Sequence, residues 1–197
     1  SLTVIAGARW SQDDKEINFI NTASNFSAAA GIPDGTVLFD LQSAIGASAN
    51  PAHAKVDEID YGDVATRLQL NYQVEDTLIY ASINRGIKGG NWSPSSAVTL
   101  DDFRHDEEDL MAYELGYKTT LLDGTGRLNA SIFYYDYSDY QAFSLSGGTP
   151  QVTNEDASAF GGEVEFVYMP NNHWDFNLGL AYMDSEVDFI PGVIPGS

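Results

Sequence analysis

The sequence contains no cysteine and few basic residues, and these two absences exclude several classes of protein. Without cysteine there is no disulfide framework, no cysteine-ligated zinc site and no thiol nucleophile. Only 9 Lys and Arg accompany 29 Asp and Glu, which gives the 197 residues a formal net charge of −20. Nucleic-acid binding depends on Lys and Arg that displace phosphate counterions, so we expect no nucleic-acid partner. The three histidines are scattered, and we expect neither a metal nor another cofactor.

The chain also lacks a hydrophobic run of about 18 residues, the length that indicates a transmembrane helix. It is instead rich in residues that suit β-structure, with 18 Gly, 11 Tyr and 10 Phe. A strand of a membrane β-barrel needs only about ten alternating residues, so residence in a membrane stays open.

Apolar and polar residues alternate with a period of two in seven stretches. The clearest is Trp174–Tyr182, in which every second residue is Trp, Phe, Leu, Leu or Tyr, and Asp, Asn, Gly and Ala stand between them. Such alternation predicts a strand with one apolar and one polar face. The other six stretches start near Leu2, Val64, Ile79, Tyr113, Leu128 and Val164. The sequence therefore predicts an all-β protein with about seven long strands.

The connectors between these strands differ in length in a regular order. Short, turn-like segments lie at 74–76, 123–125 and 170–172. Long segments rich in Gly, Ser, Asn and Asp lie near 21–61, 91–108 and 144–157 and are expected to be loops. Short turns at one end and long loops at the other are typical of an antiparallel up-and-down meander in a transmembrane β-barrel. We therefore interpret residues 1–197 as a partial segment of a large barrel.

Strand length and aromatic residues favour the same interpretation. Residues 126–143 form one candidate strand, far longer than the typical 5–6 residues of soluble proteins. Aromatic residues gather toward strand ends, as in the girdles at the two membrane interfaces. We expect one girdle of Tyr134, Tyr135, Tyr137, Tyr140 and Phe143, and an opposite girdle of Tyr72, Tyr168 and Trp174.

Four stretches, in this order, resemble strands of the TonB-dependent outer-membrane receptors. They are LTVIAGARWSQDDKE (Leu2–Glu16), LIYASINRGIKGGNW (Leu78–Trp92), the stretch Glu107–Gln141 with its YELGYK motif, and NEDASAFGGEVEF (Asn154–Phe166). In this resemblance, the family's characteristic positions are filled by Glu108, Glu114, Gly116, Lys118, Asn129, Phe133 and Gln141.

The resemblance implies a function in the outer membrane of Gram-negative bacteria. It implies active uptake of a scarce nutrient, such as a ferric siderophore complex, driven by the TonB complex and without covalent chemistry. The expected partners are outer-membrane lipid, the small ligand, and TonB acting through an N-terminal plug domain. This sequence has no counterpart of the plug, the TonB box or the C-terminal closing strand, so we expect an internal segment of a longer receptor.

Charged and aromatic residues near the predicted strand ends are the candidate functional residues. Six charged residues on predicted polar faces are expected to form structural cross-strand pairs in the barrel lumen, or contacts to a plug: Arg67, Glu114, Lys118, Arg127, Glu163 and Glu165. Candidate ligand contacts near the loops are Arg85, Lys88, Trp92, Tyr137, Tyr140 and Phe143. The acidic run 101–109 has no calcium-loop spacing and is expected to be a solvated loop.

Two other functions are compatible with the alternation alone. A passive, porin-like channel has the same strand pattern, and a soluble secreted β-sandwich that binds glycans also alternates. No Ser–His arrangement or phosphate-loop spacing is present, so we expect no enzymatic activity.

Overall fold

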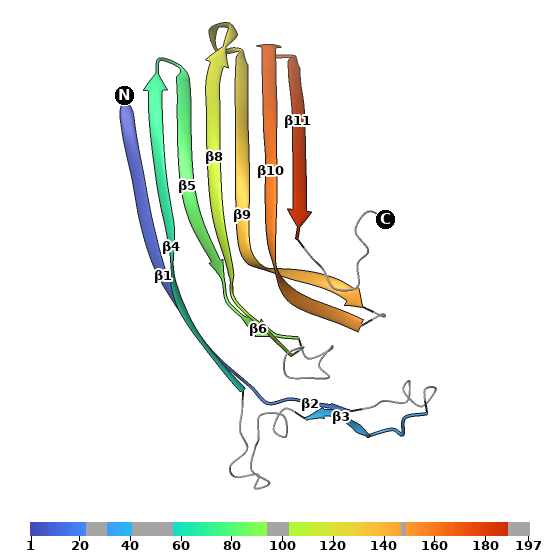
Figure 1. The fold of residues 1–197 in the computed structure, drawn as a ribbon. Coiled ribbons are helices and arrows are strands. Elements are labelled where there is room, and N and C mark those ends of the chain that lie inside the picture. Colours follow the sequence, from blue (N-terminus) through green and yellow to red (C-terminus); the bar gives the residue numbers. More distant parts are fainter. Residues whose placement is uncertain (23–30, 41–56, 94–102, 147–148, 189–197) are drawn as a thin grey trace.

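The computed structural model describes residues 1–22, 31–40, 57–93, 103–146 and 149–188. Seven long strands form one antiparallel sheet in the order β1-β4-β5-β8-β9-β10-β11, which confirms the predicted meander (Figure 1). The long strands are β1 (Leu2–Ile17), β4 (Asp57–Val74), β5 (Thr77–Lys88), β8 (Glu108–Leu121), β9 (Gly126–Ser146), β10 (Thr149–Asn171) and β11 (Trp174–Val187).

Two short hairpins lie at one end of this sheet, and tight turns lie at the other. The hairpins pair β2 (Ile20–Thr22) with β3 (Val37–Asp40), and β6 (Asn91–Trp92) with β7 (Arg104–His105). We call this the loop end of the sheet. The opposite turn end, at the top of Figure 1, holds the predicted short connectors, among them the 3-10 turn Leu122–Gly124. There Gly124 takes a φ of +92°, which an L side chain rarely adopts.

The structure corrects the predicted long loops. Residues 144–146 and 149–157 are strand rather than loop, because β9 continues to Ser146 and β10 starts at Thr149, and 147–148 lie outside the described residues. Their Gly, Ser and Thr content resembles a loop, but the backbone is paired across the two strands. The segments 21–61 and 91–108 contain the two hairpins, and β4 and β8 start inside them at Asp57 and Glu108. Residues 23–30, 41–56 and 94–102 lie outside the described part of the chain.

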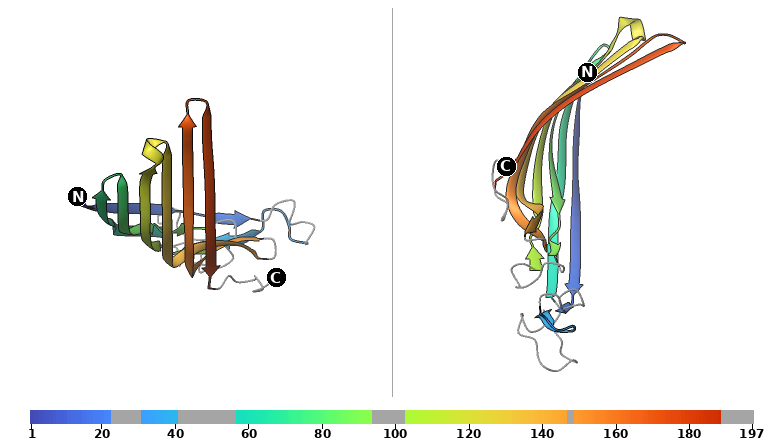
Figure 2. Two further views of the ribbon diagram at one scale, coloured as in Figure 1. Left: turned by 90° about the horizontal axis from the view of Figure 1, so that it is seen from above. Right: turned by 90° about the vertical axis from the view of Figure 1, so that its right-hand side faces the viewer.

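The strand register sorts the side chains into the two predicted faces. Residues that pair directly across strands share a face, and one such row crosses all seven strands. It consists of Val4, Leu70, Ala81, Leu115, Ile132, Gly162 and Tyr182. The neighbouring row on the other face contains Asn71, Tyr80, Ser131 and Glu163. The described long strands form a single curved layer rather than a sandwich (Figure 2).

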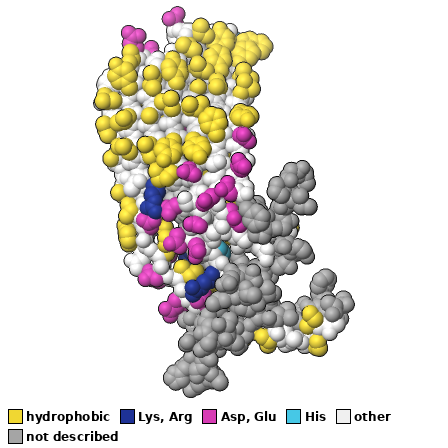
Figure 3. Space-filling model, in the orientation of Figure 1, with side chains coloured by type: hydrophobic (Ala, Val, Ile, Leu, Met, Phe, Trp, Pro, Cys, Tyr) yellow, Lys and Arg dark blue, Asp and Glu magenta, His cyan; other side chains and the backbone are white. Residues whose placement is uncertain are grey.

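A band of exposed apolar side chains covers the turn-end half of one face, and acidic side chains predominate beyond it (Figure 3). On β11 the band runs from Trp174 to Tyr182, and Leu178 and Leu180 are 58% and 66% exposed. These nine residues span ~30 Å along the strand. Their number matches the 9–11 residues with which a tilted barrel strand crosses a bilayer. Among the described residues, no helix is long and apolar enough to span a membrane.

The band is staggered from strand to strand, and the stagger gives the tilt of the strands. On β11 the apolar band ends, toward the loop end, at Tyr182, and the row of paired residues through Tyr182 reaches β1 at Val4. On β1, however, the band continues to Trp10, which lies six residues beyond Val4 toward the loop end. Six residues cover ~20 Å, and the six steps between seven strands cover ~29 Å, so the strands tilt by ~35° from the normal of the band. Membrane barrels tilt their strands by about 35–45°.

Candidate functional site

The polar face carries all six charged residues that the sequence analysis placed there, but they do not pair with one another. Within the described residues, Glu114 accepts a hydrogen bond from Tyr80, Glu163 from Ser131 at 3.3 Å and Glu165 from Asn129 at 2.9 Å. Arg67 donates to Gln69, and the ammonium of Lys118 lies 5.6 Å from the centre of the Tyr80 ring.

The register explains why the predicted cross-strand ion pairs are missing from the described sheet. Lys118 lies opposite Leu78 and Asn129, and Asn129 separates it from Glu165. Glu114 lies between Ser82 and Phe133. Each of the three carboxylates thus accepts a hydrogen bond from a neutral donor, and none forms an ion pair with a cation among the described residues.

A concave groove of about 470 Å³ lies on the polar face in the turn-end half. Small residues on β11, Gly179 and Ala181, leave room for it. Its polar lining comes from Tyr80, Lys118, Asn129, Ser131, Glu163, Glu165 and Asn177. The groove is therefore a polar surface at the level of the apolar band on the opposite face.

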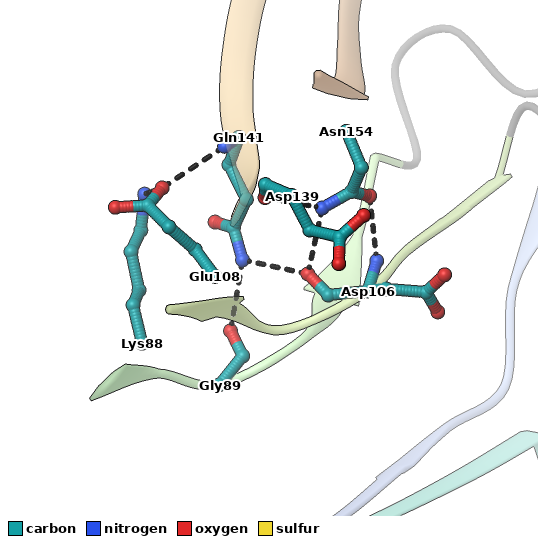
Figure 4. Close-up of polar contacts among 7 residues, drawn as sticks. All are labelled: Lys88, Gly89, Asp106, Glu108, Asp139, Gln141 and Asn154. Carbon is teal, nitrogen blue, oxygen red and sulfur yellow. Dashed lines mark hydrogen bonds and ion pairs between the residues drawn. The ribbon is translucent and has the colours of Figure 1, made fainter. Parts of the chain in front are cut away.

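A second polar cluster joins the β6–β7 hairpin to β9 and β10 at the loop end (Figure 4). The side-chain amide of Gln141 donates to the carbonyl oxygens of Gly89 and Asp106, at 3.1 and 3.0 Å. The side chain of Asn154 accepts from the Asp106 N–H at 2.8 Å and donates to the carbonyl oxygens of Asp106 and Asp139 at 3.2 and 2.7 Å. The backbone groups that flank the hairpin are thus hydrogen-bonded to two amide side chains rather than to a neighbouring strand.

Three of the six candidate ligand contacts are held by partners within the chain. Lys88 lies 3.4 Å from Glu108, whose carboxylate also accepts from the backbone N–H of Gln141. The indole of Trp92 donates to Asp57 at 2.7 Å.

Arg85 forms ion pairs with Asp63 and Asp109. The pairing of Arg85 with Thr66 and Met111 places it on the apolar face, one row beyond Ile83.

Asp57 anchors the β6–β7 hairpin to the start of β4. It is 3% exposed and accepts from Trp92 and from the Arg104 guanidinium, which binds both carboxylate oxygens. Burial alone would raise the pKa of Asp57, but the hydrogen bonds from Arg104 and Trp92 outweigh it and bring the pKa below its ordinary value of 3.8. Sequence reasoning missed this anchor, because 47 residues separate its two charges.

We expect this anchor to survive mild acid. Because the pKa of folded Asp57 lies below that of the unfolded chain, its stabilising contribution is complete above pH 3.8 and is lost as the pH falls through the lowered folded value. The fluorescence of Trp92 can be isolated by subtracting the spectrum of the Trp92→Phe variant from that of the receptor. This difference signal should stay constant from pH 7 to about 5 and change only when the pH falls below the ordinary pKa of an aspartate. In Asp57→Asn the same signal should not titrate in acid. A transition near neutral pH would contradict this assignment.

The aromatic residues of β9 divide between the two faces, which corrects the expected girdle. Tyr134 belongs to the apolar face and stacks on Tyr113 with ring centroids 6.3 Å apart. Tyr135 and Tyr137, one and three residues further on, lie on the polar face. The reason is the strict alternation of a strand, which gives neighbouring residues opposite directions. Phe143, near the end of β9, is 65% exposed.

A β-bulge brings Tyr137 and Tyr140 onto the same face. Tyr137 pairs with Ala157 and Tyr140 with Glu155, so three steps on β9 match two on β10. The extra residue is accommodated near Asp139, whose φ is +55°. The two rings meet edge to face, with centroids 5.3 Å apart. The sequence analysis named both tyrosines as candidate ligand contacts but predicted neither the bulge nor the role of Asn154. For Asn154, the only indication in the sequence is its place in the NEDASAFGG stretch.

Comparison with known proteins decides the family. The TonB dependent receptor-like β-barrel family model matches residues 1–196, nearly the whole chain. The chain belongs to the TonB-dependent receptors. This family assignment places the chain in the outer membrane of Gram-negative bacteria, in a receptor β-barrel rather than a soluble β-sandwich, and in a family of receptors rather than enzymes.

Solved structures of two uptake or outer-membrane receptors and of a copper transporter share the fold at low sequence identity. The ferric yersiniabactin uptake receptor FyuA of Yersinia pestis matches 94% of this chain and 24% of its own, with a TM-score of 0.70 and 19% identity. The match to the copper transporter OprC covers 94% of this chain and 27% of the transporter, with a TM-score of 0.68 and 18% identity. The match to the alcaligin outer-membrane receptor FauA of Bordetella pertussis covers 95% of this chain and 28% of that receptor, with a TM-score of 0.56 and 16% identity. The chain thus spans about a quarter of the length of these structures.

The family assignment orients the sheet. Its apolar face is the outer, lipid-facing side of the receptor barrel and its polar face the inner side; the turn end is periplasmic and the loop end extracellular. The described part of the acidic run, residues 103–109, lies at the extracellular end, and 101–102 fall outside the described residues. In the part of the chain that the structure covers, no three acidic or His side chains are grouped to hold a metal ion.

Proposed function

We propose that this chain forms part of the wall of a receptor that takes up a scarce nutrient, such as a ferric siderophore complex, with energy supplied by TonB. A plug domain elsewhere in the receptor would fill the barrel and connect it to TonB. The names of two structural neighbours mention metal cargo, ferric yersiniabactin and copper. Their fold likeness supports the same class of ligand here.

One observation carries this proposal: the inner face holds charged side chains and a groove that the wall itself does not fill. Glu163 and Glu165 line the groove of about 470 Å³ and interact only with neutral donors among the described residues. Carboxylates at the level of the hydrocarbon band are costly unless they face water or another polar partner. The inner face therefore suits a polar plug surface and a hydrated substrate path.

Uptake of radioactive iron by iron-starved cells tests the proposal. Cells with the receptor should take up the ferric siderophore of their own culture saturably, and a protonophore or loss of TonB should stop the uptake. Deletion of the receptor should remove this component, and the intact gene should restore it. Uptake that does not saturate and ignores the protonophore would indicate a passive channel and contradict the proposal.

A further inference from the structure

The bulge at the extracellular end of β9 has a consequence for the inner face of the wall. In a regular strand, residues 137 and 140 would point to opposite faces, because three steps separate them. The bulge places both tyrosines on the inner face and in edge-to-face contact, 5.3 Å between ring centroids. Bulges often occur where a side chain must be redirected near a functional site.

The backbone at the bulge adopts an unfavourable conformation that neighbouring groups hold in place. Asp139 has a φ of +55°, which costs a non-glycine residue free energy. Asn154 donates to the carbonyl oxygen of Asp139 at 2.7 Å and also binds both backbone groups of Asp106. The cluster in Figure 4 therefore fixes the bulge and, with it, the relative position of the two rings.

The strip of wall beside the two tyrosines is apolar on β10. Ala157 and Ala159 on β10, each 9% exposed, lie opposite Tyr137 and Tyr135. Towards the periplasm, the Phe133 and Tyr135 rings stack with centroids 4.8 Å apart. The aromatic strip thus begins at the extracellular end and runs into the barrel beside the groove.

The charges around the strip are mostly negative. Glu155 pairs with Tyr140 in the register, and Asp139 and Asp156 lie at the bulge. Lys88, at the end of β5, is already paired with Glu108 of β8 at 3.4 Å. Such surroundings disfavour a ligand with several negative charges and favour a neutral or cationic one.

We propose that Tyr137 and Tyr140 form a binding platform for the ring of a neutral or cationic ring-bearing metal chelate. An aromatic ring stacks on one tyrosine and meets the edge of the other. Asn154 is a positioning residue, which acts through the bulge and does not touch the ligand. This inference rests on the proposed uptake function and narrows its class of ligand.

Binding of three ferric chelates to the full receptor in detergent tests the platform. N-benzoyl and N-acetyl ferrioxamine B are both neutral and differ only by the aromatic ring, whereas a ferric tris-catecholate is trianionic. The receptor should bind the benzoyl chelate about tenfold more tightly than the acetyl chelate. In Tyr140→Ala this preference should disappear. Tyr134→Ala, which removes a ring from the outer face of the same strand, should keep it.

Asn154→Ala separates positioning from general loss of structure. It should reduce the preference for the benzoyl chelate and leave the affinity for the acetyl chelate nearly unchanged, whereas simple unfolding would lower both. The platform is refuted if the wild-type receptor fails to bind the benzoyl chelate, shows no preference for it, prefers the tris-catecholate, or keeps its preference in Tyr140→Ala. None of these results touches the proposed function, which stands or falls with the protonophore-sensitive uptake of iron.

Discussion

Leu178→Arg is expected to destabilise the receptor in lipid by about 2–4 kcal/mol, the cost of an arginine on the lipid face near the middle of the bilayer. Leu178 lies in the middle of the apolar band of β11 and is 58% exposed on the outer face. Its cross-strand partner is Phe166, so no polar side chain directly opposite can accept the new charge. The guanidinium must either remain in hydrocarbon or reach past two further rows of apolar side chains.

Asn177→Arg is the matched control, because it adds the same charge one residue away on the inner face. Asn177 lines the polar groove together with Glu165, so the new cation has water and a carboxylate nearby. We expect a change below about 1 kcal/mol, as for an exposed charge pair. Urea unfolding of the full receptor in phospholipid vesicles measures both. Equal effects of the two substitutions would mean that the two faces do not differ in their surroundings, and the assigned membrane orientation would be wrong.

The contrast between these two neighbours also shows why the strands were predictable from the sequence. A wall with lipid on one side and water on the other must alternate, and every strand carries that constraint within its own residues. The stretch from Trp174 to Tyr182 needs no information from elsewhere in the chain to reveal its two faces.

Features that depend on register could not be predicted in the same way. Whether Lys118 meets Glu165 or Asn129 is fixed by how β8, β9 and β10 are aligned, and a single sequence does not contain that alignment. The Asp57–Arg104 anchor needs the path of a long connector as well.

The extracellular part of β9 and β10 was misassigned for a different physical reason. Beyond the lipid band neither face of a strand has to be apolar, so the period of two fades although the backbone stays paired. Residues 149–154 therefore look like a loop in sequence while they pair with 141–146 in the structure. The bulge at Asp139 is hidden for a related reason, because it shifts a tyrosine between faces without changing the composition of the strand.

Gly161→Ala is the second substitution with a large expected effect, about 2–3 kcal/mol of destabilisation, the upper part of the range for overpacking. A Cβ at this position would lie 2.5 Å from Cζ of Phe133 and 2.6 Å from the carbonyl oxygen of Tyr182. The ring can rotate away, but the carbonyl belongs to the backbone of β11, so β10 and β11 must separate locally. The displaced Phe133 ring would also lose its packing over residue 161. Such packing of an aromatic ring over a glycine of the neighbouring strand stabilises sheets.

Gly179→Ala provides the control on the partner strand of the same inner face. A Cβ there meets no atom within 4 Å, so the substitution should change stability by less than about 0.5 kcal/mol or raise it slightly, because alanine restricts the unfolded chain. The same unfolding measurement compares the two variants. Equal stability would show that the close approach of Phe133 and β11 to Gly161 is not kept in the membrane. A selective loss in Gly161→Ala would show that this glycine is required for β9, β10 and β11 to pack as one wall, the wall that holds the aromatic strip in place.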